Sequence, residues 1–199
     1  MKDIALVAVT KSASIEAVLR AKEAGIGVFA ENRIREAQEK IPLVPAEWHL
    51  VGHLQSNKIK DALGLFQMIQ SLDSLSLAWK LNAELLLQNR VFPVLLEVNI
   101  SGEKQKFGFG PEELYGAADE IKHLSQIQVM GLMGIAPNTP DGGARRAAFK
   151  KLKGLFGVCK TLKSERFEMK YLSMGMSDDY EIAIEEGSNM VRLGRALFR

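Results

Sequence analysis

Short apolar runs alternate with longer helix-like segments along the whole chain. The apolar runs are rich in β-branched residues, as expected for strands that are buried on both faces. The segments between them carry helix caps or apolar positions spaced three to four residues apart. The predicted strands cover residues 4–9, 28–31, 48–52, 66–71, 91–100, 127–133, 169–174 and 189–194. The predicted helices cover residues 14–25 (with Ser14 as N-cap), 32–41, 56–63 (capped by Ser56), 74–89, 111–124, 143–163 and 178–186.

This alternation predicts an α/β fold with a parallel sheet and helical crossovers. Eight repeats favour closure into a (β/α)8 TIM barrel. The pattern alone leaves an open, doubly wound sheet as the alternative. No linker, low-complexity segment or break in composition divides the sequence. We therefore expect residues 1–199 to form a single domain.

Charge and composition exclude several classes of protein. The 26 basic residues are interspersed with 24 acidic ones, and the densest basic stretch, residues 145–153, is interpreted as a solvated helix face rather than a nucleic-acid patch. No apolar run reaches the roughly 18 residues of a membrane span. A single cysteine, Cys159, excludes a disulfide within the chain and fits a reducing compartment. Without a signal-peptide pattern, we expect a cytoplasmic protein.

Several motifs that carry chemistry are missing. The sequence has no G-x-x-x-x-G-K-[ST], H-E-x-x-H, C-x-x-C or G-x-S-x-G pattern. Of the three histidines, His49 is interpreted as a core residue with its hydrogen bonds satisfied, and only His53 follows a predicted strand. We therefore expect neither a metal site nor a catalytic triad.

Polar side chains gather where the predicted strands end. The carboxyl ends of barrel strands form the rim on which active sites lie. The run LVAVT is followed directly by Lys11, and a lysine at that position costs desolvation energy unless a ligand or a partner uses it. The polar residues predicted at this rim are Lys11, Glu31, Asn32, His53, Gln55, Asn57, Gln70, Ser71, Glu97, Asn99, Ser173, Ser177 and Arg192.

Alternation of side chains along the strands sharpens this prediction. If Lys11 points into the barrel, Val7 and Val9 do so as well, and Ala8 faces the helices. On the last strand Arg192 shares a face with Met190. A buried arginine needs an acceptor, so Arg192 is either a site residue or the partner of a core carboxylate such as Glu97.

Seven segments, in colinear order, carry a resemblance to a known family: LVAVTK, ENRIREA, WHLVGHLQSNK, VNISGEKQKFG, GLMGIAP, LSMGMSDDYEIAI and MVRLGRALF. With these segments, the chain resembles the YggS/PROSC-type pyridoxal phosphate homeostasis proteins from Ile4 to Phe198. The resemblance implies a fold-type-III barrel like the N-terminal domain of alanine racemase. It also implies that Lys11 holds pyridoxal 5′-phosphate as an internal aldimine, a Schiff base.

The resemblance also assigns roles around the cofactor. Asn32 matches the asparagine beside the ring, and Arg192 matches the arginine that faces the pyridine nitrogen. Ser177 and the backbone around Gly194 and Arg195 match the phosphate cradle. Ser177 should stand at the start of a helix, and the following residues, Asp178 and Asp179, should face solvent because they would repel a phosphate. The positions matched near the pocket with less direct roles are His53, Met133, Ser173 and Met174.

The resemblance implies a non-catalytic carrier that stores, delivers or buffers the cofactor in vitamin B6 homeostasis. An arginine facing the pyridine nitrogen keeps it unprotonated, which makes the ring a weak electron sink. Partners would be the cofactor and, transiently, enzymes that require it; the protein would be a monomer without nucleic-acid or membrane contacts. One alternative is an amino-acid racemase with weak or narrow activity, but Tyr115, Tyr171 and Tyr180 have no evident claim to be its second base. Another is a phosphate-ligand enzyme in which Lys11 is an aldolase-type amine.

Overall fold

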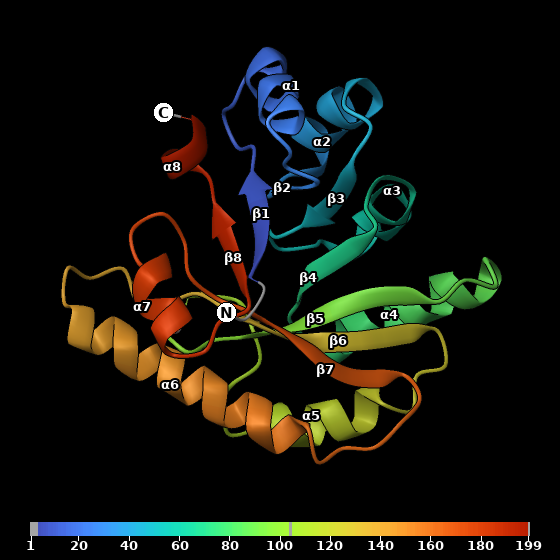
Figure 1. Ribbon diagram of the computed structural model, residues 1–199. Coiled ribbons are helices and arrows are strands. Elements are labelled where there is room, and N and C mark those ends of the chain that lie inside the picture. The colour runs from blue at the N-terminus through green and yellow to red at the C-terminus, as the bar shows by residue number, and fades with distance from the viewer. Residues whose placement is uncertain (1–3, 104, 199) are drawn as a thin grey trace.

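Eight parallel strands pair in chain order, and the last pairs with the first, in a computed structural model that describes residues 4–103 and 105–198 (Figure 1). Closure places Ala5 beside Met190 and Ala8 beside Leu193. The predicted barrel is therefore confirmed, and the open sheet is wrong. The strands are β1 (Ala5–Val9), β2 (Val28–Glu31), β3 (Glu47–Leu50), β4 (Met68–Leu72), β5 (Phe92–Val98), β6 (Ile127–Gly134), β7 (Phe167–Ser173) and β8 (Met190–Leu193).

A helix follows each strand, and the helices surround the barrel (Figure 1). The last, α8, directly follows β8 and was not predicted. The α-helices are α1 (Ile15–Glu23), α2 (Ile34–Lys40), α3 (Ile59–Leu65), α4 (Leu75–Leu87), α5 (Leu114–Ile121), α6 (Gly142–Cys159), α7 (Tyr180–Glu185) and α8 (Arg195–Phe198), with 3-10 turns at Ile41–Leu43 and Ser56–Lys58.

The Ser14, Ser74 and Asp141 side chains cap α1, α4 and α6, whereas α2, α3, α5 and α7 have no side-chain cap. The Ser14 hydroxyl accepts the Ala17 backbone N–H at 3.3 Å, which confirms the predicted cap of α1. The prediction that Ser56 caps the third helix is wrong. The chain first makes a 3-10 turn from Ser56, so α3 begins only at Ile59 and has no side-chain cap.

Two apolar layers hold the fold together. The larger layer lies between the strands and the helices and includes Ala8, Phe29 and Trp48. The smaller layer fills the barrel, as close packing of side chains in such barrels requires. Its position confirms the predicted phase of β1, because Val7 lies inside with Val9 packed against it, whereas Ala8 lies outside. The buried members of the inner layer are Val7, Ala30, Met68, Leu95, Met133 and Met190.

Candidate functional site

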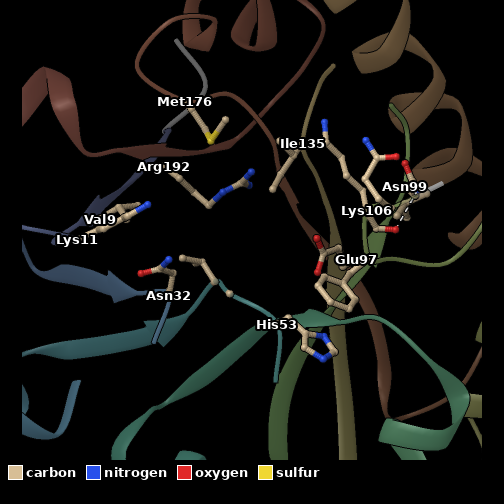
Figure 2. A pocket seen from close by; sticks show the side chains of 15 residues that line it. Val9, Lys11, Asn32, His53, Glu97, Asn99, Lys106, Ile135, Met176 and Arg192 are labelled. Carbon is tan, nitrogen blue, oxygen red and sulfur yellow. Dashed lines mark hydrogen bonds between the residues drawn. The ribbon is translucent and has the colours of Figure 1, made fainter. Parts of the chain in front are cut away.

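Two adjoining cavities open where the strands end. The larger has a volume of about 500 Å³ and the smaller of about 330 Å³. Both are lined by Val9, Lys11, Met176 and Arg192, so they form one continuous pocket. Figure 2 shows Lys11 and Arg192 reaching into it from one side, opposite Glu97.

We call the side with Lys11, Asn32, Met176 and Arg192 the Lys11 wall. The opposite side, which we call the Glu97 wall, consists of His53, Glu97, Asn99, Lys106 and Phe107.

Lys11 follows β1 in a tight turn that is held by hydrogen bonds to the Thr10 carbonyl. The Ala13 N–H donates to the Thr10 carbonyl at 2.9 Å, and the residue after Lys11, Ser12, has a φ of 62°. This left-handed backbone is uncommon for a residue other than glycine. The Thr10 carbonyl also accepts the Lys40 ammonium at 2.7 Å. The turn that presents Lys11 is thus held by a cation from α2.

That cation belongs to a buried ion pair. Lys40 Nζ lies 2.6 Å from Glu31 Oε1, and the Thr10 hydroxyl donates to the same oxygen at 2.5 Å. Glu31 is fully buried and Lys40 is 7 % exposed. A buried carboxylate without a cation would be strongly destabilising. The pair therefore ties together the ends of β1 and β2, from which Lys11 and Asn32 project.

Arg192 crosses the inside of the barrel. Its Nη1 donates to the Ser173 hydroxyl at 2.7 Å and its Nη2 to the Gly134 carbonyl at 3.0 Å. Arg192 is 4 % exposed, and burial lowers its pKa to about 10, against the opposing effect of the Glu97 and Asp179 carboxylates. These bonds answer the question left open by the sequence. Among the described residues, the acceptors of the guanidinium are Ser173 and Gly134 rather than Glu97.

The smaller cavity is bordered by Ser177 and the backbone after β8. The Ser177 hydroxyl lies 3.2 Å from the Ala196 N–H and 3.4 Å from the Gly194 N–H, both of which point toward it. A Cβ on Gly194 would lie 3.1 Å from the Val9 carbonyl, so the backbone runs close to β1. The two N–H groups donate to the Ser177 oxygen, so the Ser177 hydrogen is left to donate to an anion in the smaller cavity.

Two predictions about this loop need correction. Ser177 does not start a helix, because α7 begins at Tyr180 and Ser177 faces the start of α8 instead. The expectation that Asp179 faces solvent is wrong, because it is 8 % exposed and its Oδ1 accepts the Met176 N–H at 2.6 Å. That bond closes the turn after β7. Asp178 does lie at the surface, where it pairs with Arg195.

Asn32 borders the pocket on the Lys11 wall. Its Oδ1 is buried, and no described residue donates a hydrogen bond to it. Gly52 makes room for this segment, because a Cβ at Gly52 would lie 2.2 Å from the Asn32 carbonyl oxygen. Only glycine permits so close an approach of two backbones. A buried acceptor beside a pocket, without a protein donor, is suited to bind a ligand.

The Glu97 wall carries a different kind of chemistry. His53 Nδ1 lies 2.5 Å from Asp73 Oδ2, and the His53 ring stacks on Phe107 with centroids 3.7 Å apart. Burial first, and the Asp73 carboxylate second, raise the pKa of Glu97 to about 7 against the opposing effect of Arg192. This wall therefore changes its charge near neutral pH.

The structure brings together most, but not all, of the residues singled out from the sequence. Eight of them border the pocket or bond to a residue that does: Lys11, Asn32, His53, Ser173, Ser177, Arg192, Gly194 and Arg195. Met133 is fully buried in the inner apolar layer, and Met174 packs in the outer layer because side chains alternate after Ser173. Neither lines a cavity, which removes the geometric basis for their assignment.

Sequence reasoning missed Met176, Lys106 and Phe107 as lining residues. Met176 stands beside Ser177 in the segment SMGMSDD, so its place next to the predicted cradle was the available signal. Lys106 and Phe107 belong to the segment VNISGEKQKFG, in which no pattern of residues indicates which side chains reach the pocket.

Comparison with known proteins supports the architecture. The family model described as the alanine racemase N-terminal domain matches residues 1–199. A solved structure of this fold, alanine racemase from Clostridium difficile, superposes with a TM-score of 0.77 at 17 % identity, over 99 % of this chain and 51 % of its own. At that identity the likeness concerns the fold alone.

Two other relatives are more similar. The pyridoxal phosphate homeostasis protein of Vibrio cholerae is 37 % identical over 202 residues, which cover 98 % of this chain and 84 % of the relative. PipY of Synechococcus elongatus, solved with pyridoxal phosphate bound, superposes with a TM-score of 0.87 at 32 % identity, over 98 % of this chain and 92 % of its own. Within the described residues, no helix is long and apolar enough to cross a membrane. With a family model that matches the whole chain and relatives this similar over nearly all of it, the chain belongs to the pyridoxal phosphate homeostasis proteins, a family built on the alanine racemase N-terminal domain.

Proposed function

We propose that this protein binds pyridoxal 5′-phosphate through Lys11 and serves as a non-catalytic carrier in the homeostasis of the cofactor. One observation carries the proposal. A lysine amine, an anion cradle and a buried arginine border one continuous pocket on the Lys11 wall. An aldehyde, a phosphate and a pyridine nitrogen are the three groups of this cofactor that such side chains would contact.

The phosphate end suits the smaller cavity. The N–H groups of Gly194 and Ala196 donate to the Ser177 oxygen, which leaves the Ser177 hydrogen to donate to a phosphate oxygen. Arg195 lines the same cavity and adds positive charge, although Asp178 pairs with it at the rim. Hydrogen bonds to a charged acceptor are stronger than neutral ones, so this cradle supplies much of the affinity.

Lys11 suits the aldehyde end. Its side-chain amine is the group that would hold the aldehyde of the cofactor covalently. When bound, pyridoxal phosphate supplies an electron-poor ring that stabilises negative charge on an attached carbon. The turn braced by Lys40 and Thr10 holds the amine in place.

Arg192 favours storage over chemistry. The guanidinium is protonated at neutral pH even with its pKa lowered to about 10. A group that only donates hydrogen bonds keeps a facing pyridine nitrogen unprotonated, which weakens the ring as an electron sink. The tyrosines Tyr115, Tyr171 and Tyr180 line neither cavity, so none of them supports a second base in the manner of a racemase.

The Glu97 wall favours one alternative, an amino-acid racemase of weak or narrow activity. His53, bonded to Asp73, and Glu97, with its pKa near 7, face Lys11 across the pocket and are groups that can move protons. A panel of amino acids separates the two functions. The carrier shows no turnover above that of free pyridoxal phosphate, whereas sustained turnover abolished by Lys11→Ala would establish the enzyme.

The proposal extends to the state of the protein in the cell. We propose a cytoplasmic monomer of a single domain that meets enzymes requiring the cofactor only transiently. Pairing of β1 with β8 involves both ends of the described chain in one barrel, which supports a single domain.

The decisive test is chemical labelling of the loaded protein. Reduction with borohydride after loading should fix the cofactor on the peptide that contains Lys11, as peptide mass mapping shows. Lys22→Ala, at an exposed position on α1, is the matched control and should label like the parent. Labelling of another lysine, such as Lys106 on the Glu97 wall, would overturn the assignment.

The cradle is tested separately. Ser177→Ala should weaken binding about ten- to a hundred-fold, the value of one hydrogen bond to a charged group. The visible absorbance of the bound cofactor should persist, with saturation at higher concentration. Lys11→Ala should remove that absorbance altogether. A folded Ser177→Ala variant that binds as tightly as the parent would contradict the cradle.

A further inference from the structure

A row of polar side chains runs through the apolar interior of the barrel. It starts at Glu47 on β3, continues through His49 and Gln70, and reaches Ser173 and Arg192. The distances are 2.9 Å from His49 Nε2 to Glu47 Oε1, 2.9 Å from Gln70 Nε2 to His49 Nδ1, and 2.7 Å from the Ser173 hydroxyl to Gln70 Oε1. The last step, from Arg192 to Ser173, is 2.7 Å. We call these five residues the interior chain.

The interior chain is buried except at one end. Gln70 and Ser173 are fully buried and His49 is 2 % exposed, whereas the Glu47 side chain is 51 % exposed at the start of its strand. Met68, a member of the inner apolar layer, lies on the same strand as Gln70. Barrels of this kind are usually filled by branched apolar residues, and a polar row costs desolvation energy at every member. Apolar side chains at these positions would avoid that desolvation cost, which suggests that the polar residues have a function.

Arg192 and Glu47, the two ends of the interior chain, determine which group donates in each of its hydrogen bonds. A guanidinium can only donate, and a carboxylate can only accept. Arg192 therefore donates to Ser173, and Ser173 donates to the carbonyl oxygen of Gln70. The Gln70 amide then donates to His49 Nδ1, which leaves the His49 proton on Nε2 to face Glu47. The hydrogen bond from His49 lowers the pKa of Glu47, as this direction requires.

We propose that Gln70 and His49 are positioning residues, which act through Ser173 to hold the Arg192 guanidinium toward the pocket. Gln70 takes the only hydrogen of the Ser173 hydroxyl, so the lone pairs of that oxygen are left to face Arg192. His49 fixes the orientation of the Gln70 amide, and Glu47 fixes the tautomer of His49. The effect on the cofactor rests on the proposed function; the effect on Arg192 itself does not.

The first experiment uses the cofactor-free protein. In ¹⁵N spectra His49 should be the neutral tautomer with its proton on Nε2, and the two Nη groups of Arg192 should give separate signals. Gln70→Leu should merge the Nη signals, because the guanidinium regains rotation. Met68→Leu is the matched control, a buried neighbour on the same strand that makes no bond in the chain, and should leave them separate. A His49 proton on Nδ1, or equal behaviour of parent and Gln70→Leu, would overturn the proposal.

The second experiment uses pyridoxal phosphate as the probe. Gln70→Leu should weaken its binding about ten-fold, the worth of one buried hydrogen bond, and shift its absorbance. Ser173→Ala should do the same, and Ser173→Thr, which keeps the hydroxyl, should restore the parent values. The double variant Gln70→Leu/Ser173→Ala should be no weaker than Ser173→Ala alone, because both act through one contact.

The proposal would be overturned if the double variant lost as much binding free energy as Gln70→Leu and Ser173→Ala lose together. If Gln70→Leu does not fold, the pair Ser173→Ala and Ser173→Thr decides by itself, with equal binding in both variants as the contrary result. Failure of the unaltered protein to bind pyridoxal phosphate would instead refute the proposed function. The spectra of His49 and Arg192 would still test the interior chain in that case.

Discussion

The two walls of the pocket are held in different ways. On the Lys11 wall Arg192 donates to Ser173 and Gly134, and the turn that presents Lys11 is braced by Lys40, which bonds to Glu31 and Thr10. On the Glu97 wall no described cation lies within ion-pair distance of Glu97. That carboxyl has a pKa of about 7 as a result of its burial.

The difference indicates what each wall can do. A wall whose charges are fixed before binding suits a ligand with fixed charges, because little reorganisation accompanies binding. A wall whose charge changes near neutral pH responds to its surroundings instead. Figure 2 shows the two walls facing each other across one pocket. We infer that retention of the cofactor belongs to the Lys11 wall and that pH sensitivity belongs to the Glu97 wall.

The largest expected effect comes from breaking the ion pair beneath Lys11. Lys40→Met leaves the fully buried Glu31 carboxylate without a cation and should lower the free energy of unfolding by about 3–5 kcal/mol. Urea unfolding measures this loss. The double variant Lys40→Met/Glu31→Met, which removes both charges, should recover most of it.

The matched control for that experiment is Lys58→Met. It removes an exposed pair with Asp61 and should cost no more than about 1 kcal/mol. If the two lysine substitutions cost the same, the Lys11 wall is not anchored by its buried pair. The contrast with the Glu97 wall would then disappear.

The fold could be predicted from the sequence because it depends on local patterns. Alternating strands and helices indicated the barrel, and the period of two along β1 placed Val7 inside and Ala8 outside. The inward position of Arg192 followed from the same alternation. His49 was interpreted as a satisfied core residue, and its bonds to Glu47 and Gln70 confirm this.

The contacts that shape the site were less accessible, because they join residues distant in sequence. Gln70 and Ser173 are 103 positions apart, and no local pattern pairs them. Lys40 reaches Thr10 across 30 positions, and no local pattern distinguishes it from other lysines in a helix. The expectation that Asp179 faces solvent was wrong for a related reason. Its partner is the backbone N–H of Met176, and no residue pattern indicated the geometry of that turn.

The second effect concerns pH and the Glu97 wall. The pKa of Glu97 is about 7 in the folded protein, above its ordinary 4.5, so between these values the folded state keeps a proton that the unfolded state has lost. The free energy of unfolding should therefore fall as the pH rises from about 4.5 to about 7, by up to roughly 3 kcal/mol, and level off above that range.

Glu97→Gln isolates this contribution, because the amide cannot ionise. Urea unfolding of the cofactor-free parent and variant across this pH range should show a difference that grows in favour of the variant. A difference that stays constant with pH would show that Glu97 does not titrate in the pocket. The Glu97 wall would then be as fixed as the Lys11 wall.

The smallest effect comes from the stacked rings on the Glu97 wall. Phe107 is 55 % exposed, and its ring lies 8° from parallel with that of His53. Phe107→Ala should lower the free energy of unfolding by about 0.5–1.5 kcal/mol, the value of such a ring pair. Leu87→Ala, at a side chain that is 82 % exposed, is the control and should change stability by less.

The affinity of Phe107→Ala for pyridoxal phosphate tests the difference between the two walls more directly than its stability does. If retention belongs to the Lys11 wall, Phe107→Ala should change the affinity for pyridoxal phosphate by no more than about two-fold, well under the effect of one lost hydrogen bond. Titration followed by absorbance measures this. A loss as large as that of Ser177→Ala would mean that the Glu97 wall also holds the cofactor. The stacked pair would then be part of the binding site, and the division of labour between the walls would be wrong.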